Sequence, residues 1–157
     1  MMDCKEIICD IRNTSDEERA NAKRLTELLF QLNHTMPLSE EYNAVLKKIF
    51  GENIGTGSYI APPLNGAAID RMKIGNNVFI NSNLLAMARG SITIEDDVQI
   101  AGNVSLLSNN HDPYERMILP CKPILIQKGA WIGANVIILP AYQSANILLW
   151  EQVLLSQ

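Results

Sequence analysis

Aliphatic residues recur at every sixth position in the second half of this chain, usually with another aliphatic residue four positions later. The spacing appears in three stretches: Ile74, Val78 and Ile80; Ile94, Val98, Ile100, Val104 and Leu106; and Ile126, Ala130, Ile132, Val136 and Ile138. Helices repeat about every 3.6 residues and strands about every 2, so neither explains this period. A chain that turns a corner after each short strand explains a period of six residues, and three such hexads close one triangular coil. Because hexapeptide repeats are typical of parallel β-helices, the spacing predicts a mainly β fold of that kind.

A helical segment precedes the repeat. Residues 15–50 read as two helices, and the first begins at a capping box formed by Ser15 and Glu18. We therefore expect a small N-terminal two-helix cap over 1–52, followed by a β-helix over 53–140. The cap is expected to provide packing surface rather than the active site.

The repeat is interrupted over 107–123 and resumes at Ile124. An insertion of this length has to loop out of a β-helix, and loops on rigid scaffolds are where function concentrates. His111 lies in this extended loop, in the polar, turn-forming sequence from Ser108 to Pro113. An imidazole there can act as a general base that takes a proton from a hydroxyl near neutral pH. The simpler alternative is a solvated loop histidine.

The other histidine is interpreted as structural, and the cysteines are interpreted as free reduced thiols. His34 lies at a helix end. A chain with 2 histidines disfavours a three-histidine zinc site, so we expect no metal. Cys4, Cys9 and Cys121 form an odd set without metal-like spacing and are expected to be free thiols.

Composition and charge argue against several classes of partner. A formal net charge of -4 without a basic cluster argues against nucleic acid. No apolar run approaches the roughly 18 residues that span a bilayer, so no membrane association is expected. The charged N-terminal sequence lacks the apolar core of a signal peptide, which favours a cytoplasmic location.

Four short segments occur in a fixed order along the chain: Asn33-His34, Ile74-Gly75-Asn76-Asn77-Val78-Phe79-Ile80-Asn81, Asn110-His111 and Trp131-Ile132-Gly133. Together they resemble the maltose and galactoside O-acetyltransferases, which belong to the left-handed β-helix acyltransferases. The resemblance runs from about residue 15 to residue 140 and includes the helical cap. It also supplies the handedness of the expected coil, because left-handed crossovers are otherwise rare among parallel strands.

The resemblance implies transfer of an acetyl group from acetyl-CoA to a hydroxyl of a small acceptor. His111 matches the family's general base, which lets the hydroxyl attack the thioester directly, without an acyl-enzyme. Asn81 matches an acceptor-binding asparagine, and Trp131 and Ala134 match positions at the acetyl-CoA site. The family further implies a homotrimer in which acetyl-CoA lies in the groove between two β-helices.

Two departures from the sugar-specific members leave the acceptor open. The chain has Ala67 where they carry a serine, and the stretch 84–90, apolar apart from Arg89, where they carry an acidic residue. An arginine cannot accept hydrogen bonds from sugar hydroxyls as a carboxylate does. A sugar or sugar-like acceptor therefore stands beside two alternatives: N-acetylation of an amino-sugar acceptor, and a non-catalytic trimeric scaffold.

The repeat fails after Pro140, where the segment 141–157 contains no further hexad. A one-base shift of the reading frame with suitable codons turns this segment into a regular hexapeptide coil. We therefore interpret 141–157 as an aberrant, out-of-frame tail. On that interpretation the coils that complete the family's acetyl-CoA groove are lost, and the activity of this form stays open.

Overall fold

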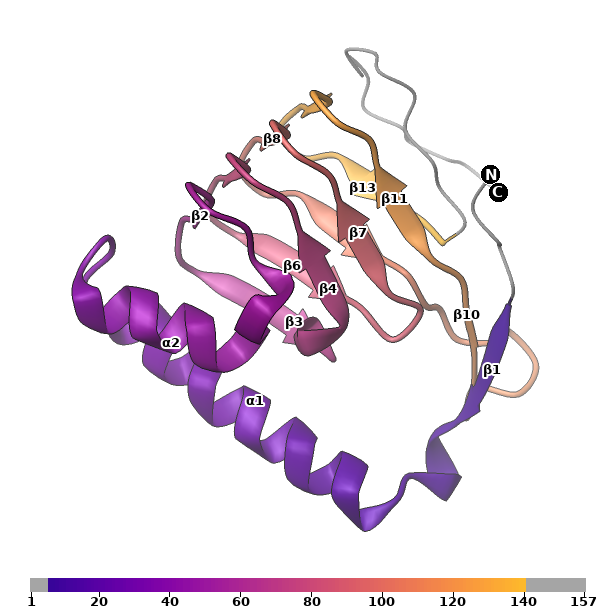
Figure 1. Cartoon of the computed structure of the whole chain (residues 1–157). Coiled ribbons are helices and arrows are strands. Elements are labelled where there is room, and N and C mark those ends of the chain that lie inside the picture. The colour runs from indigo at the N-terminus through magenta and orange to yellow at the C-terminus, as the bar shows by residue number, and fades with distance from the viewer. Residues whose placement is uncertain (1–5, 141–157) are drawn as a thin grey trace.

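In the computed structural model, which describes residues 6–140, a stack of β coils rests on two helices (Figure 1). The helices are α1 (Asp16–His34) and α2 (Glu40–Phe50). Three short 3-10 turns accompany them: η1 (Ile11–Asn13), η2 (Gly51–Asn53) and η3 (Ile69–Arg71). A separate strand, β1 (Ile7–Asp10), precedes the helices and lies at the far side of the molecule from α2 (Figure 1).

The expected capping box opens α1. The Ser15 hydroxyl accepts a hydrogen bond from the Glu18 N–H at 3.2 Å, and the Glu18 carboxylate accepts one from the Ser15 N–H at 2.9 Å. The Ser39 hydroxyl caps α2 by accepting from the Tyr42 N–H at 3.0 Å. Gly51 ends α2 at a φ of 57°, in the left-handed region that favours glycine. Both helices expected within residues 15–50 are therefore present.

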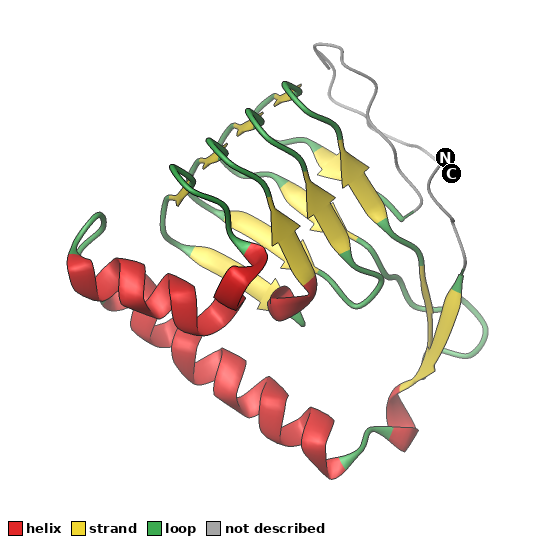
Figure 2. Cartoon of the chain, in the orientation of Figure 1, coloured by secondary structure: helices red, strands yellow, loops and turns green. Residues whose placement is uncertain are grey.

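The strands of the coil form three parallel sheets, seen as yellow arrows in Figure 2. Their orders are β11-β7-β4, β12-β8-β5-β2 and β13-β9-β6-β3. The bounds are β2 (Tyr59–Ile60), β3 (Leu64–Ala67), β4 (Met72–Ile74), β5 (Phe79–Ile80), β6 (Leu84–Met87), β7 (Ile92–Ile94), β8 (Gln99–Ile100), β9 (Ser105–Leu107), β11 (Ile124–Ile126), β12 (Trp131–Ile132) and β13 (Ile137–Ile138). Consecutive strands lie in different sheets, which confirms the parallel β-helix expected from the sequence.

The length of one coil differs from the expected three hexads. Ile74 pairs with Ile94, so neighbours in this sheet are twenty positions apart. The six-residue spacing runs from Ile74 through Ile80 to Ala86 and then takes eight residues to reach Ile94. The two additional residues lengthen the corner at 88–91, which separates β6 from β7.

Asparagine and aspartate residues occupy the tight corners. They take positive φ angles at Asn77 (55°), Asn83 (63°), Asp97 (60°), Asn103 (61°) and Asn135 (61°). These short polar side chains tolerate the left-handed conformation better than most L-residues do. Asn83 also donates to the Asn103 side chain at 2.9 Å, so successive corners are tied together along the stack.

The inward aliphatic residues form one continuous core. Ile80, Ile100 and Ile132 pair along one sheet and are each 1% exposed or less. These inward residues alternate with exposed neighbours such as Gln99. The strands therefore show in the sequence as regularly spaced aliphatic residues and not as continuous hydrophobic runs.

The two helices close one end of this core. The Tyr42 hydroxyl on α2 donates to the Ile60 carbonyl at 2.6 Å. The Asn33 side chain on α1 donates to the Leu64 carbonyl and accepts from the Leu64 N–H, both at 2.9 Å. The first coil has no preceding coil to pair with, so these bonds satisfy backbone groups that a neighbouring strand would otherwise satisfy.

One strand pair was not expected from the sequence. β1 pairs antiparallel with β10 (Ile118–Cys121), which lies inside the stretch 107–123 that was interpreted as a loop. The two strands are more than one hundred residues apart in sequence, so neither carries a local signal of the other. This stretch is therefore a loop that ends in an edge strand held by the N-terminal segment.

No helix within residues 6–140 is long and apolar enough to cross a membrane. The segment 141–157, interpreted above as an out-of-frame tail, lies outside the described residues.

The core makes a quantitative prediction. We expect Ile100→Ala to lower the free energy of unfolding by about 2–5 kcal/mol, because the side chain is buried and its removal leaves a cavity. Gln99→Ala, at the neighbouring outward position, should change it by less than about 0.5 kcal/mol. Urea unfolding monitored by circular dichroism measures both, and equal costs for the two variants would contradict the inward assignment.

Candidate active site

Three corners of the coil lie on one edge of the β-helix. They are 68–71 between β3 and β4, 88–91 between β6 and β7, and 108–123 between β9 and β11. Because the strands on both sides pair in register, the corners lie one above another. The third is the extended loop: Ile94 pairs with Ile126 thirty-two positions later, twelve more than in the preceding coil.

Ser108 anchors the loop to the corner below it. This fully buried residue donates its hydroxyl proton to the Met87 carbonyl at 2.7 Å and accepts from the Gly90 N–H at 2.9 Å. The loop closes on itself through the Lys122 N–H, which donates to the Ser108 carbonyl at 2.9 Å. A Cβ on Gly90 would lie 2.4 Å from that same carbonyl oxygen, so the close approach requires glycine.

Asp112 shapes the tip of the loop. Its carboxylate accepts hydrogen bonds from the backbone N–H groups of Tyr114 and Glu115, both at 2.8 Å. These two backbone donors, Glu115 first and then Tyr114, hold the pKa of Asp112 below its ordinary value. The turn continues through the Ile118 N–H, which donates to the Glu115 carbonyl at 2.9 Å. The polar residues around His111 therefore build a defined turn.

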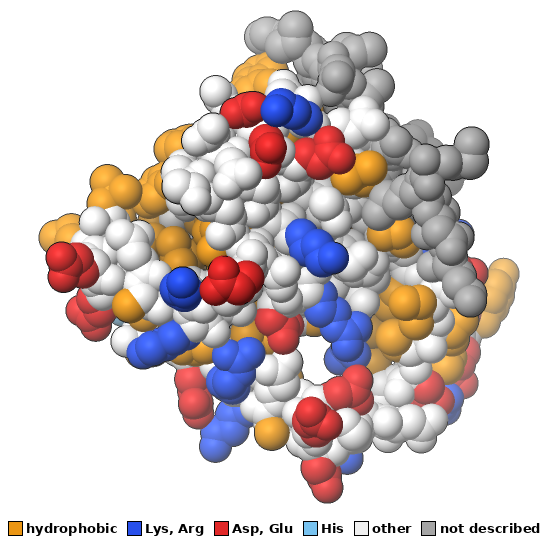
Figure 3. Space-filling view, viewed as in Figure 1, with side chains coloured by type: hydrophobic (Ala, Val, Ile, Leu, Met, Phe, Trp, Pro, Cys, Tyr) orange, Lys and Arg blue, Asp and Glu red, His pale blue; other side chains and the backbone are white. Residues whose placement is uncertain are grey.

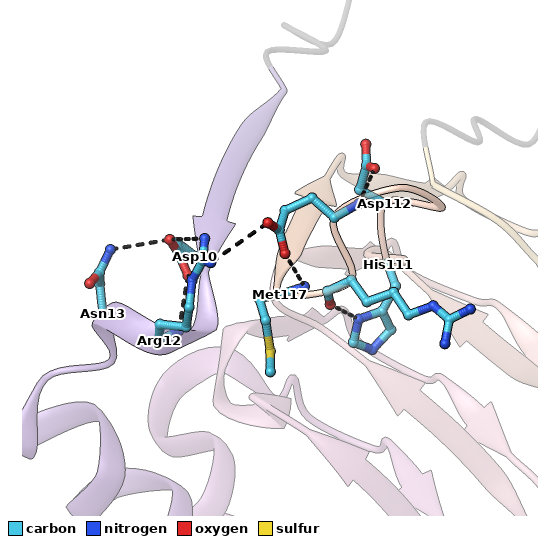
Figure 4. A network of polar contacts seen from close by, with 8 residues as sticks. Asp10, Arg12, Asn13, His111, Asp112 and Met117 are labelled. Carbon is cyan, nitrogen blue, oxygen red and sulfur yellow. Dashed lines mark hydrogen bonds and ion pairs between the residues drawn. The ribbon is translucent and has the colours of Figure 1, made fainter.

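His111 is exposed at this turn, and its ring is oriented by a short hydrogen bond. Its Nδ1 lies 2.6 Å from the Arg116 carbonyl oxygen (Figure 4). A carbonyl oxygen only accepts, so Nδ1 carries a proton, and in the neutral ring the free lone pair is then on Nε2. Figure 4 shows the ring and the Met117 side chain on one side of the loop, facing the lower coils, and Asp112 on the other. This arrangement leaves one ring nitrogen able to accept a proton from a bound group.

The N-terminal strand holds the outer side of the loop. The Ile11 N–H donates to the Met117 carbonyl at 3.0 Å, directly beyond the β1–β10 pairing. Arg12 pairs with Asp10 at 2.8 Å and with Glu115 of the loop at 3.6 Å (Figure 4). Exposed ion pairs of this kind contribute little stability, so the backbone pairing is the stronger restraint.

The other residues expected at the site lie elsewhere on the chain. Asn81 follows β5, Trp131 is half-buried on β12, and Ala134 is exposed in the corner after β12. Their sheet lies at the opposite side of the coil from β10 and the extended loop (Figure 1). The Asn81 side chain accepts from the adjacent Ser82 N–H at 2.7 Å, which is a local turn contact. Within one chain the structure therefore does not bring these three residues to His111.

A small cavity that the sequence did not reveal lies on the same edge as the loop. Its volume is about 130 Å³, and its lining includes α1 residues, Gly66–Ala68, Arg71 and Arg89. Figure 3 shows a hollow between α1 and the coils that is bordered by basic side chains above and acidic side chains below. Arg89 stood out in the sequence as a charge within an apolar stretch, but nothing local linked it to Arg71 or to α1.

Two other features are less suited to chemistry. A larger groove of about 610 Å³ crosses the outer face of β4 and β7, but it is open and contains no residue of the extended loop. Within residues 6–140 no cluster of histidine, cysteine, aspartate and glutamate side chains has the composition of a metal site. The edge that carries the loop and the small cavity is therefore the candidate active site.

Comparison with known proteins gives a consistent set of similarities. The chain is 28% identical over 140 residues to galactoside O-acetyltransferase of Escherichia coli, covering 86% of this chain and 67% of that protein. It is 32% identical over 130 residues to a putative acetyltransferase of Dictyostelium discoideum, covering 80% of this chain and 67% of that protein. No protein-family model matches the chain.

Solved structures show the same relationship. A hexapeptide-repeat acetyltransferase from Vibrio cholerae superimposes with a TM-score of 0.75 at 31% identity, over 82% of this chain and 74% of that one. A galactoside acetyltransferase in complex with coenzyme A superimposes with a TM-score of 0.74 at 26% identity, over 82% of this chain and 66% of that one.

The anchor of the loop can be tested by stability. We expect Ser108→Ala to lower the free energy of unfolding by about 1–3 kcal/mol, because the buried Gly90 N–H loses its partner. Ser105→Ala, a half-exposed serine on β9, serves as the matched control and should cost less than about 0.5 kcal/mol. Urea unfolding compares the two, and a Ser108→Ala cost no larger than that of the control would contradict the anchoring role.

Proposed function

The chain belongs to the hexapeptide-repeat acetyltransferases, the family of the galactoside and maltose O-acetyltransferases, and on this premise we propose that it transfers an acetyl group from acetyl-CoA to a hydroxyl of a small acceptor. The similarity to galactoside acetyltransferase bound to coenzyme A supports the donor. The oriented ring of His111 is the single observation that carries the chemistry. Acetyl-CoA supplies a thioester, an activated acyl group.

His111 acts as the general base in this proposal. Its Nε2 takes the proton of the acceptor hydroxyl while the hydroxyl oxygen bonds to the thioester carbonyl carbon. The bond between that carbon and the CoA sulfur breaks, and His111 returns the proton to the departing sulfur. The products are the acetyl ester and the free CoA thiol, and the imidazole ends neutral. No side chain becomes acetylated.

The Arg116 carbonyl positions this base. A proton fixed on Nδ1 by the 2.6 Å hydrogen bond prevents the other tautomer, in which Nε2 would be a donor and unable to accept. The carbonyl also interacts favourably with the imidazolium that forms when Nε2 is protonated. Asp112 supports the same geometry because it fixes the turn that presents Arg116.

A complete site requires a second copy of the chain. Trp131 and Ala134, which would hold acetyl-CoA, and Asn81, which would contact the acceptor, lie far from His111 in one chain (Figure 1). We propose a homotrimer in which these residues of one protomer meet the extended loop of its neighbour. Exposed outward residues on the coil support such packing: Phe79 is 45% exposed and Ile137 is 53% exposed.

A non-catalytic scaffold is the second candidate. A scaffold would need the coil and its outward apolar residues but would have no use for a short hydrogen bond that selects one tautomer of an exposed histidine. That bond favours the enzyme. N-acetylation of an amino sugar uses the same base, since the ammonium group must lose a proton before it attacks.

The role of His111 can be tested directly. We expect His111→Ala to reduce kcat/KM by about 10²- to 10⁴-fold, because a general base contributes that much to proton transfer. The assay is thiol release from acetyl-CoA with a panel of hydroxyl acceptors. His34→Ala is the matched control, because His34 is an exposed helix-end residue that stacks on Phe30 at 4.2 Å. Near-normal turnover of His111→Ala would refute the proposed mechanism.

A further inference from the structure

The small cavity lies beneath the extended loop, at the two shorter corners of the same edge. Arg71 belongs to the corner at 68–71 and Arg89 to the corner at 88–91, and both line the cavity of about 130 Å³. The Arg71 guanidinium donates to the Arg89 carbonyl at 3.0 Å, which holds the two corners together. Gly90, which follows Arg89, bonds to Ser108 at the start of the extended loop. The arginines and His111 therefore stand on three consecutive corners.

Neither arginine of this cavity forms an ion pair with a described residue. Among residues 6–140, no carboxylate oxygen lies within 4.0 Å of the Arg71 or Arg89 guanidinium nitrogens in an ion pair. Two acidic residues, Asp70 and Glu18, also line the cavity. Asp70 accepts from the Asn21 amide at 2.8 Å through Oδ2, while its Oδ1 is buried without a hydrogen-bond partner among the described residues. Glu18 accepts from the Ser15 N–H at 2.9 Å.

Both arginines influence the pKa values of side chains on the elements at either side of the cavity. The pKa of Glu18 on α1 is lowered first by the Ser15 N–H, and Arg89 and Arg71 add to the lowering. Burial raises the pKa of Cys121 on β10 to about 12, with Cys9 contributing, while both arginines oppose that rise. The guanidinium groups thus lie between the first turn of α1 and the strand that ends the extended loop.

We propose that Arg71 and Arg89 bind a carboxylate of the acceptor, so that the acceptor is a hydroxyl compound that carries a carboxylate, such as a uronic acid. This inference rests on the proposed acetyl transfer and names its acceptor class. An arginine fork matches a carboxylate with two parallel hydrogen bonds.

The size of the cavity agrees with this assignment. The cavity volume of about 130 Å³ is well above the roughly 10–15 Å³ that one water molecule needs on this measure, which leaves room for a carboxylate and the carbon that bears it. The rest of the acceptor then extends toward the extended loop, where a hydroxyl can meet Nε2 of His111. Polar side chains in the lining, such as Asn21 and Thr26, can hydrogen-bond to hydroxyl groups of the acceptor, whereas the two arginines supply the charged donors that a carboxylate requires.

Galacturonate and galacturonamide provide a matched pair of probes. They carry the same hydroxyl groups and differ at one substituent, which is a charged carboxylate in galacturonate and a neutral amide in galacturonamide. We expect the protein to bind galacturonate roughly 10- to 100-fold more tightly in isothermal titration without acetyl-CoA, as hydrogen bonds to charged groups imply. The KM for acetyl transfer should show the same preference, measured by thiol release.

Two variants and one control test whether the two arginines cause the tighter binding of galacturonate. Arg89→Gln and Arg71→Gln should each weaken galacturonate binding by about 10-fold or more and leave galacturonamide unchanged, since each removes one charged hydrogen-bonding partner. Arg19→Gln is the control, because Arg19 is an exposed α1 residue that pairs with Asp16 and does not line the cavity. Unfolding temperatures of the three variants verify that each is folded.

The outcomes separate this inference from the proposed function. Acetyl transfer to both probes with equal KM values would overturn the carboxylate subsite and leave acetyl transfer intact. Arginine-dependent binding of galacturonate without transfer to either probe would overturn the proposed function and leave the subsite. If neither probe binds, the subsite is wrong.

Discussion

The in-register pairing of successive coils is the constraint on which the rest of the structure depends. Ile74 pairs with Ile94, and Ile94 with Ile126, whether twenty or thirty-two residues separate them. The core therefore accepts an insertion only at a corner, where the inward aliphatic residues on each side can stay in place. Stacking of the corners then aligns the extended loop with the two corners below it, and the candidate active site follows from that alignment.

Long-range contacts turn the inserted loop into a rigid platform. Ser108 ties its start to the corner below, and β1 pairs with β10 at its end. Between these anchors, Asp112 shapes a turn that presents the Arg116 carbonyl to the His111 ring. The tautomer of one exposed histidine is thus selected by a series of hydrogen bonds that begins at the buried Ser108.

The sequence predicted the architecture well because each coil repeats a local pattern. The inward aliphatic residues, the capping box at Ser15 and the loop that carries His111 all had local signals. The strand β1, the cavity between α1 and the corners, and the convergence of Arg71 on Arg89 had none, since each joins segments distant in sequence. The two additional residues between Ala86 and Ile94 were visible in the spacing of the aliphatic residues. That they lengthen the corner at 88–91 was visible only in the structure of the stacked coils.

Mass spectrometry of a single turnover shows whether the acetyl group passes straight from acetyl-CoA to the acceptor. Purified protein in molar excess over acetyl-CoA is mixed with a hydroxyl acceptor, and the masses of the acceptor and of the intact protein are measured. In direct transfer the acceptor gains the mass of one acetyl group while the protein mass stays unchanged, with one free CoA thiol for each product. Acetyl found on the protein, or thiol released without an acetylated acceptor, would contradict direct transfer.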